Sequence, residues 1–285
     1  MIQGSPEWHE HRAKHSNASE AGAVMSVSPW FPKTPADLYD LKTGVKEVKM
    51  NAAMQHGIDT EGEARVYAEQ YFGPLTPAVV TRGRYSASLD GIDFNGTVAV
   101  EIKCPSSSGS KLFDITTPEN LKALAPHYWY QIVHQFYTGE KLDKIAFVIY
   151  HADRRNIVTV NRADVEADFK PLITAWEAFN ACMDQGIRPE QEDLDESETF
   201  QEIVQRYRIQ KLRLEAEEKA FKAIEEEVKA YASRSGKSSL KGFGATISQV
   251  TRQGNVDYKK IPELKGVDLD KYRGKSTTYW TVRTA

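Results

Sequence analysis

Two carboxylates and a lysine in the middle of the chain have the types and the spacing needed to bind a metal ion and activate a water molecule. Glu101 and Lys103 are two positions apart in the β-branched run 98–103, so on a strand their side chains share one face. The Asn-Gly signal within 93–96 predicts a hairpin turn that brings Asp90 beside Glu101. Carboxylate oxygens suit Mg²⁺, and a lysine can polarise an attacking water. These three residues are therefore candidate catalytic groups.

The same residues also have a simpler interpretation, because a Glu and a Lys two positions apart often lie on a solvent-facing strand. Val100 and Ile102 alternate with them and are expected to point the other way, into a core. This alternation indicates a strand that is buried on one face. It supports a catalytic site, but the residues alone leave the surface-strand alternative open.

The elements that must position these groups mix helices and strands. Apolar residues at three- and four-residue spacing predict helices within 34–72, at 118–137 and at 164–185. Alternating β-branched residues predict strands at 84–89, 97–104, 144–151 and 156–161. We therefore expect an α/β (α+β) domain over residues 1–190, with a short mixed, mainly antiparallel sheet flanked by helices.

Beyond residue 190 the character of the chain changes. Residues 191–232 indicate an acidic linker followed by a long amphipathic helix, in which Phe200, Tyr207 and Leu214 recur every seven positions. Residues 233–285 hold eleven Lys or Arg and four Asp or Glu, a balance of +7, and the rest of the chain, with 26 basic and 36 acidic residues, has −10. This asymmetry indicates two modules, an acidic body and a small basic C-terminal module. The residue pattern of that module, which ends in the β-branched and aromatic run 277–283, predicts that it is β-rich.

The composition excludes several classes of protein. With 285 residues, 40% of them hydrophobic, the chain is long enough to bury a core. Its two cysteines, Cys104 and Cys182, are too few for a disulfide framework or a four-cysteine zinc or iron–sulfur site. No apolar run approaches the ~20 residues of a membrane helix, and no secretory signal pattern is visible. We expect a soluble, intracellular protein.

Four motifs follow one another along the first part of the chain. They are the stretch 3–20, the segment 57–65, Asp90 with Glu101-Ile-Lys103, and the segment 128–135. Together they resemble the phage lambda-type exonucleases of the YqaJ-like viral recombinase family, in the PD-(D/E)XK nuclease superfamily. Leu89 stands where that superfamily nominally has Pro. The resemblance implies a restriction-endonuclease-like core, and it does not extend to residues 191–285.

The resemblance implies a metal site. Asp90 and Glu101, with the backbone carbonyl of Ile102, would bind the catalytic ion, and Glu61 would approach a second metal position. Two Mg²⁺ ions per active site are implied, with Mn²⁺ as a substitute.

The resemblance also implies roles in positioning water and DNA. Lys103 would position the nucleophilic water and Gln131 would help to orient it. Arg12 and Ser19 would receive a 5′-terminal phosphate, for which the two parallel donors of an arginine are well suited. Asn17 stands where the lambda-type enzymes have Thr, and its role would also be in phosphate binding.

The implied activity is that of a Mg-dependent deoxyribonuclease. It would digest one strand of linear double-stranded DNA from 5′ to 3′, release mononucleotides and leave a 3′ single-stranded overhang. The implied partners are a single-strand annealing recombinase and further copies of the chain in a ring-shaped homo-oligomer, with a trimer favoured. The implied location is the cytoplasm of a bacterial host, with the gene carried by a phage or prophage. Two alternatives are a structure-selective DNA endonuclease of the same superfamily and a catalytically silent DNA-binding or assembly protein on a nuclease fold.

Two further regions carry positive charge. Arg82, Arg84 and Lys111 lie near the hairpin in sequence and are candidates for a DNA track. In residues 233–285, basic residues are interleaved with aromatic ones such as Tyr258 and Trp280. That pattern suits stacking on single-stranded DNA, but the aromatic residues could equally form the core of a small appendage or a docking surface for a partner.

Overall fold

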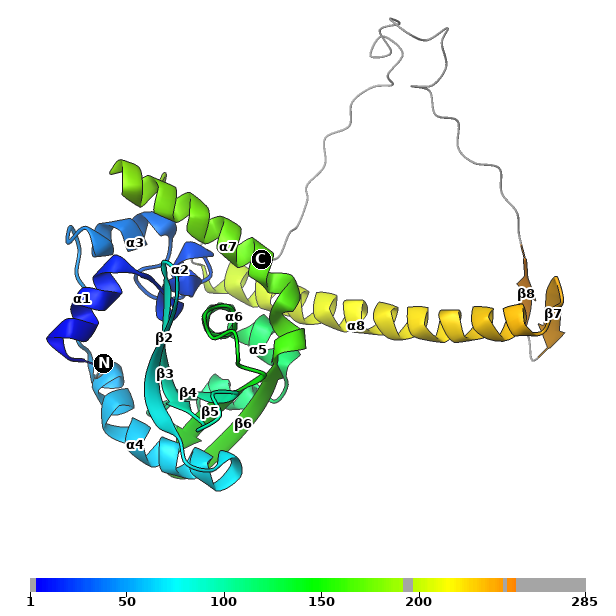
Figure 1. Ribbon diagram of the computed structural model, residues 1–285, viewed down its shortest axis with the longest axis horizontal. Coiled ribbons are helices and arrows are strands. Elements are labelled where there is room, and N and C mark those ends of the chain that lie inside the picture. The colour runs from blue at the N-terminus through cyan, green and yellow to red at the C-terminus, as the bar shows by residue number, and fades with distance from the viewer. Residues whose placement is uncertain (1–3, 192–196, 243–244, 250–285) are drawn as a thin grey trace, which may run out of the picture. The chain divides into compact units, whose positions relative to one another are not determined.

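The computed structural model describes residues 4–191, 197–242 and 245–249 (Figure 1). The chain divides into two units, residues 1–212 and residues 213–284. The first unit contains every residue that the sequence nominates for catalysis or phosphate binding. Among the described residues, no helix is long and apolar enough to cross a membrane.

A six-stranded mixed sheet forms the centre of the first unit (Figure 1). Its strands are β1 (Ser16–Asn17), β2 (Thr76–Arg82), β3 (Tyr85–Ile92), β4 (Val98–Lys103), β5 (Lys144–His151) and β6 (Arg154–Asn161). The order is β1-β3-β4-β5-β6, and β2 also pairs with β3. The pairs β1/β3 and β4/β5 are parallel, and the other pairs are antiparallel. The mixed α/β fold expected from the sequence is confirmed.

The sequence pattern does not predict β1 and β2. β2 contains Pro77, and its pairing with β3 shifts register between Thr76 and Ala78. Proline has no N–H to donate, so it is tolerated at such an irregularity. β1 has two residues, which is too short for any periodicity.

The turn between β3 and β4 forms as the Asn-Gly signal predicts. Asp93 Oδ1 accepts hydrogen bonds from the N–H groups of Thr97 and Val98, at 2.8 and 2.9 Å. Gly96 has a φ of 74°, in the left-handed region that glycine adopts readily. The turn therefore fixes the register of the two strands that carry the candidate catalytic residues.

The helices of the first unit are α1 (Pro6–Lys14), α2 (Ala21–Val24), α3 (Pro35–Lys42), α4 (Ala52–Phe72), α5 (Pro118–Leu124), α6 (Pro126–Thr138) and α7 (Arg162–Gln185), with short 3₁₀ helices at Ala18–Glu20 and Lys111–Asp114. The prediction of one helix over 118–137 is wrong. Ala125, with φ of −138° and ψ of 62°, separates α5 from α6. A residue that precedes proline is pushed away from helical angles, so Pro126 ends one helix and begins the next.

The sheet lies between two layers of helices. Val100 and Ile102 of β4 pack on one face with Ala64 and Ala68 of α4. Ala99 faces the other side, where α6 and α7 contribute the largest part of the core, including Trp129 and Trp176. The alternation in β4 thus buries both faces of the strand. The interpretation of β4 as a solvent-facing surface strand is therefore wrong.

The long helix predicted in the second half of the chain is α8 (Glu198–Arg234), which begins in the first unit and continues into the second. Large apolar side chains of its seven-residue pattern are exposed, from Val228 at 39% to Tyr231 at 67%. The second unit also contains a hairpin of β7 (Ser239–Gly242) and β8 (Ala245–Ser248). The remainder of the predicted basic module, 250–285, lies outside the described residues.

Candidate active site

β3 and β4 separate at the position of the two candidate carboxylates. The strands pair only through residues 91–92 and 99–100. At the next position the Asp90 carboxylate accepts the backbone N–H of Ile102 at 2.7 Å. A side chain therefore takes the place of a ladder bond, and Asp90 and Glu101 meet where the strands diverge.

Glu101 is held from the side of α6 by two amides. Its side chain is buried, with 2% exposed. Gln131 Nε2 donates to Glu101 Oε1 at 2.7 Å, and Gln135 Nε2 donates to Glu101 Oε2. The two glutamines are four residues apart, which places them on one face of the helix. The carboxylate is thus fixed in orientation before any ligand binds.

Lys103 points to the same side of the sheet as Glu101. Its Nζ lies 2.6 Å from Glu101 Oε1 and donates to Gln131 Oε1 at 3.3 Å. It also lies 4.4 Å from the centre of the Tyr128 ring. Burial alone would lower the pKa of Lys103, but the Glu101 carboxylate raises it overall. The lysine therefore stays protonated and acts as a hydrogen-bond donor.

Asp90 lies in a strongly acidic environment. Burial and the neighbouring Glu101 carboxylate raise its pKa well above the usual value, and Glu61 adds to the repulsion. Arg65 of α4 links Glu61 to β3, since its Nε donates to the Asp90 backbone carbonyl at 2.6 Å and its guanidinium pairs with Glu61. Arg65 thereby holds Glu61 of α4 next to the end of β3.

The donor set fits a hard divalent cation. Within the described residues, no three His, Cys, Asp or Glu side chains form a metal-binding group by themselves. A cation would therefore take the Asp90 and Glu101 carboxylates together with the Ile102 carbonyl and water. Mg²⁺ commonly keeps several waters and uses one or two carboxylates. A cation would also relieve the repulsion that raises the pKa of Asp90.

α1 lies against the part of β3 that β4 leaves free. Trp8 Nε1 donates to Ser88 Oγ at 2.9 Å, and His11 Nε2 lies 2.9 Å from Ser86 Oγ. Arg12, one turn after Trp8, donates from Nη2 to Ser19 Oγ at 2.9 Å. The packing of α1 on β3 thus brings Arg12 and Ser19 to the side of the strands that carry the candidate catalytic residues.

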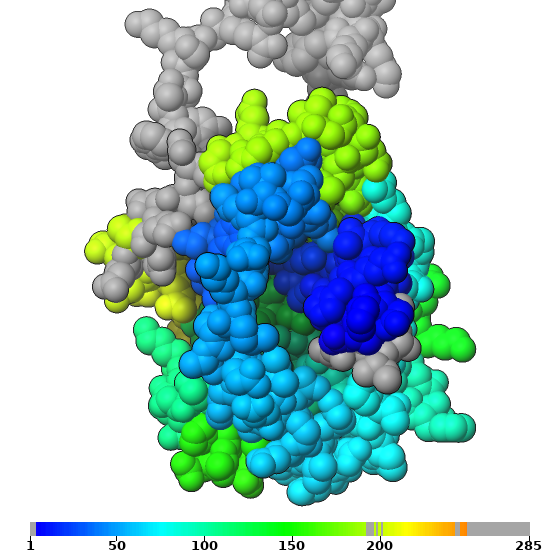
Figure 2. All heavy atoms as spheres, turned by 90° about the vertical axis from the view of Figure 1, so that its left-hand side faces the viewer, coloured from blue at the N-terminus to red at the C-terminus, as the bar shows by residue number. Residues whose placement is uncertain are grey.

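One cavity of about 810 Å³ connects these groups. Its lining includes the candidate residues Arg12, Ser19, Glu61, Asp90, Glu101, Ile102, Lys103 and Gln131. The same face is hollowed between α1 and the segment that leads into α4 (Figure 2). Trp30 and Met50 on this rim are 48% and 62% exposed. The cavity therefore combines acidic, basic and apolar surface.

Comparison with known proteins finds a matching family model and similar folds. Residues 7–141 match the family model of the YqaJ-like viral recombinase domain. Among solved structures, an alkaline exonuclease (LHK-Exo) from Laribacter hongkongensis is 25% identical, with a TM-score of 0.50, over 64% of this chain and 94% of that one. A phage-related exonuclease from Haemophilus somnus 129PT is 14% identical, with a TM-score of 0.44, over 62% and 99%. A search of curated proteins finds no match.

The first unit brings most of the predicted site residues together at this cavity, with Asn17 as the exception. Asn17 is 2% exposed, and its amide donates to the backbone carbonyls of Arg12 and His15 at 2.8 and 2.9 Å. It also donates to Glu20. Asn17 thus ties the C-terminal end of α1 to Glu20, and its side chain is not part of the lining.

The three candidates for a DNA track lie elsewhere in the domain. Arg84 makes a two-point ion pair with Asp184, at 2.7 and 2.8 Å. Arg82 pairs with Glu140 at 3.1 Å. Lys111 is not among the residues that line the cavity, although its neighbours Ser110 and Leu112 are.

Three residues that the sequence does not nominate contact the candidate site residues. They are Gln135, which binds Glu101, Tyr128, which lies under Lys103, and Arg65, which ties Glu61 to β3. Two of them could have been found from spacing, because Tyr128 and Gln135 lie three residues before and four residues after Gln131 on one helix. The contact of Arg65 spans 25 residues and leaves no local signal.

Proposed function

We propose that this protein is a Mg²⁺-dependent exonuclease that digests one strand of linear double-stranded DNA from 5′ to 3′. It releases mononucleotides and leaves a 3′ overhang. The observation that carries the proposal is the single cavity in which Asp90, Glu101 and Lys103 lie with Arg12 and Ser19. The match to the YqaJ-like domain and the likeness to an alkaline exonuclease support it.

The catalytic strand supplies the groups that hydrolysis needs. Lys103, held protonated by Glu101, donates hydrogen bonds to the attacking water or to the phosphate oxygens. The Gln131 amide, which contacts both Glu101 and Lys103, orients the same region. Mg²⁺ bound at Asp90 and Glu101 would activate the water and stabilise the leaving 3′ oxygen.

Arg12 and Ser19 support the proposed direction of digestion. An arginine offers two parallel donors that match phosphate oxygens. Because this pair lines the same cavity as the carboxylates, a 5′-terminal phosphate held there lies close to the next phosphodiester. That arrangement favours mononucleotide products and digestion from the 5′ end.

A ring-shaped homo-oligomer and a single-strand annealing recombinase are part of the proposal. Both rest on the family resemblance. A 3′ overhang is the substrate that an annealing protein requires. A ring of three copies around the duplex would keep the enzyme on DNA between successive cuts.

Covalently closed circular DNA tests the proposal against its alternatives. Linear duplex with 5′ phosphates and closed circles of the same sequence are incubated with Mg²⁺ or with EDTA, and strand-specific end labels report polarity. We expect Mg²⁺-dependent loss of the 5′-ended strand from linear DNA and intact circles. Cutting of closed circles would indicate an endonuclease. Binding of linear DNA without cleavage would indicate a silent DNA-binding protein.

A further inference from the structure

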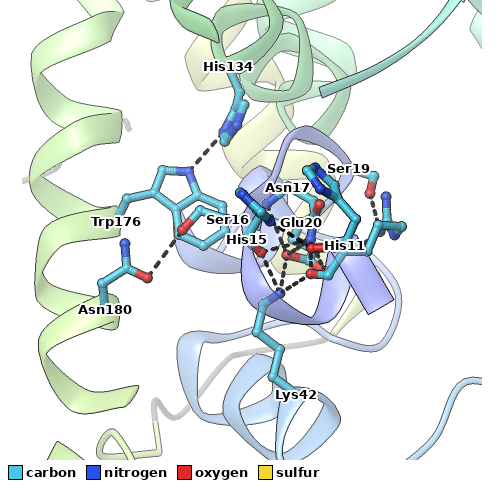
Figure 3. A network of polar contacts seen from close by, with 11 residues as sticks. His11, His15, Ser16, Asn17, Ser19, Glu20, Lys42, His134, Trp176 and Asn180 are labelled. Atoms are coloured by element: carbon cyan, nitrogen blue, oxygen red, sulfur yellow. Dashed lines mark hydrogen bonds and ion pairs between the residues drawn. The ribbon is translucent and has the colours of Figure 1, made fainter. Parts of the chain in front are cut away.

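Lys42 is a buried cation that the proposed mechanism does not use. It lies in the last turn of α3, and its side chain is 8% exposed. Figure 3 shows its ammonium directed at Glu20 and at the backbone next to His15. Nζ lies 2.9 Å from Glu20 Oε2 and donates to the His15 carbonyl at 2.9 Å. A buried charge is costly unless it is paired, so these contacts hold Lys42 in place.

Glu20 lies between two cations. Its Oε2 is 2.9 Å from Lys42, whereas its Oε1 is 3.6 Å from Arg12 Nη2. The Asn17 amide also donates to both carboxylate oxygens, at 3.1 and 3.0 Å. The Asn17 backbone N–H donates to Oε2 as well, at 3.2 Å. The Glu20 carboxylate is thus held mainly by Lys42 and Asn17 (Figure 3), and its contact with Arg12 is the longest of the five.

Arg12 is directed instead towards Ser19 and the cavity. Its Nη2 donates to Ser19 Oγ at 2.9 Å, and its guanidinium carbon lies 4.7 Å from the centre of the Trp8 ring. Arg12, Lys42 and Glu20 form a cluster of two cations and one carboxylate, which carries one net positive charge. Without the charge of Lys42, Arg12 would be the one cation that this cluster leaves to pair with Glu20. The carboxylate would then compete with a phosphate for the same N–H donors.

We propose that Lys42 is a positioning residue that keeps Arg12 available for a terminal phosphate by holding the Glu20 carboxylate away from it. The inference rests on the proposed function, because it takes Arg12 as the phosphate-binding group. Among the described residues, Lys42 is not part of the cavity lining, so it acts through Glu20 and Arg12 without touching the DNA.

Lys42 also has a structural role, and the test must separate the two. It donates to the carbonyls of Arg12 and His15 near the C-terminal end of α1, where a cation is favourable. Lys42→Met removes both roles. Lys42→Met with Glu20→Gln removes the competing carboxylate but does not restore the contacts with the carbonyls. The double variant therefore restores phosphate recognition only if charge competition is the cause.

The experiment compares duplexes that carry a 5′ phosphate or a 5′ hydroxyl. Fluorescence anisotropy in EDTA gives the ratio of the two affinities, and digestion in Mg²⁺ gives the ratio of the two rates. Relative to wild type, we expect Lys42→Met to lower both ratios about tenfold, the size of a lost charge-assisted contact. We expect Lys42→Arg and the double variant to stay near the wild-type ratios, and Glu20→Gln alone to keep them. Thermal unfolding monitors the fold of each variant.

Several results would overturn the inference. One is an unchanged phosphate preference in Lys42→Met, and another is a double variant that does not recover this preference. A third is a lost phosphate preference in Glu20→Gln, and this variant can be measured even if Lys42→Met does not fold. A wild-type protein that digests DNA without any phosphate preference would also overturn it. A wild-type protein with no nuclease activity would instead refute the proposed function, so the two failures are distinguishable.

Discussion

The Asp90 carboxylate accepts the backbone N–H of Ile102 at 2.7 Å, at the position where β3 and β4 stop pairing. The bond ties a candidate metal ligand to the backbone of the strand that carries Glu101 and Lys103. It also explains how the strands diverge without leaving the Ile102 N–H unsatisfied. One hydrogen bond therefore serves the fold and the geometry of the site together.

Asp90→Asn separates these two roles. The amide oxygen can still accept the Ile102 N–H, but the charge that a cation requires is lost. We expect a thermal midpoint close to that of wild type and a loss of nuclease activity of about 100-fold or more. Asp153→Asn, an exposed residue in the turn between β5 and β6, is the matched control. Full activity in Asp90→Asn would remove Asp90 from the metal site.

We expect Gln135 to contribute as much to nuclease activity as Gln131, although Gln135 is more deeply buried than Gln131. It is fully buried and donates to Glu101 Oε2. In Gln135→Leu that oxygen loses its donor, so the carboxylate is less well oriented. Partners of metal ligands typically contribute 10- to 100-fold to metal affinity or activity. Mn²⁺ titration followed by activity, with Gln185→Leu as control, measures the change, and an unaltered Mn²⁺ dependence would contradict the role.

Arg12→Lys tests recognition of the 5′ phosphate without removing the positive charge. A lysine is a point charge and cannot supply two parallel donors. We expect the preference for 5′-phosphorylated over 5′-hydroxyl ends to fall about tenfold, with little change on 5′-hydroxyl DNA. Lys170→Arg on α7 is the control. Equal losses on both substrates would point to a general effect on folding or DNA binding.

The ion pair between Asp40 and Arg188 is expected to make the stability of the folded protein depend on pH. Arg188 binds Asp40 at two points, at 2.7 and 3.0 Å, and holds the pKa of that carboxyl at about 2. Since the folded pKa lies below that of the unfolded chain, the pair stabilises the fold above about pH 4 and loses this effect as pH falls towards 2. The difference in thermal midpoint between wild type and Asp40→Asn should therefore shrink on acidification from about pH 5. A difference that stays constant would contradict the assignment.

The hairpin of β3 and β4 could be predicted from the sequence because its signals are local. Alternation in 98–103, the Asn-Gly turn and the position of Asp90 fix the register of two adjacent strands. The break between α5 and α6 shows where periodicity alone fails, because the apolar pattern continues across Pro126, whereas the restriction that this proline places on Ala125 divides the segment into two helices. The strand β1 could not be predicted either, because a two-residue strand has no periodicity and is defined only by its pairing with β3.

Contacts between distant segments account for what the sequence could not predict at the site. Gln135 has the spacing of a core position, and only the placement of α6 over β4 turns it into a partner of Glu101. Lys42 reaches carbonyls that lie 27 and 30 residues earlier. Neither contact leaves a periodic pattern or a turn signal.

The most direct test of the central claim is nucleotide release from linear duplex DNA by wild type, Glu101→Gln and Glu166→Gln, each with Mg²⁺ and with EDTA. Glu166 lies exposed on α7 and is not among the residues that line the cavity. The account predicts Mg²⁺-dependent release by wild type and Glu166→Gln, and none by a folded Glu101→Gln. Release by Glu101→Gln at the wild-type rate, or release by wild type that persists in EDTA, would contradict the assignment of the Asp90–Glu101–Lys103 cluster as the catalytic centre.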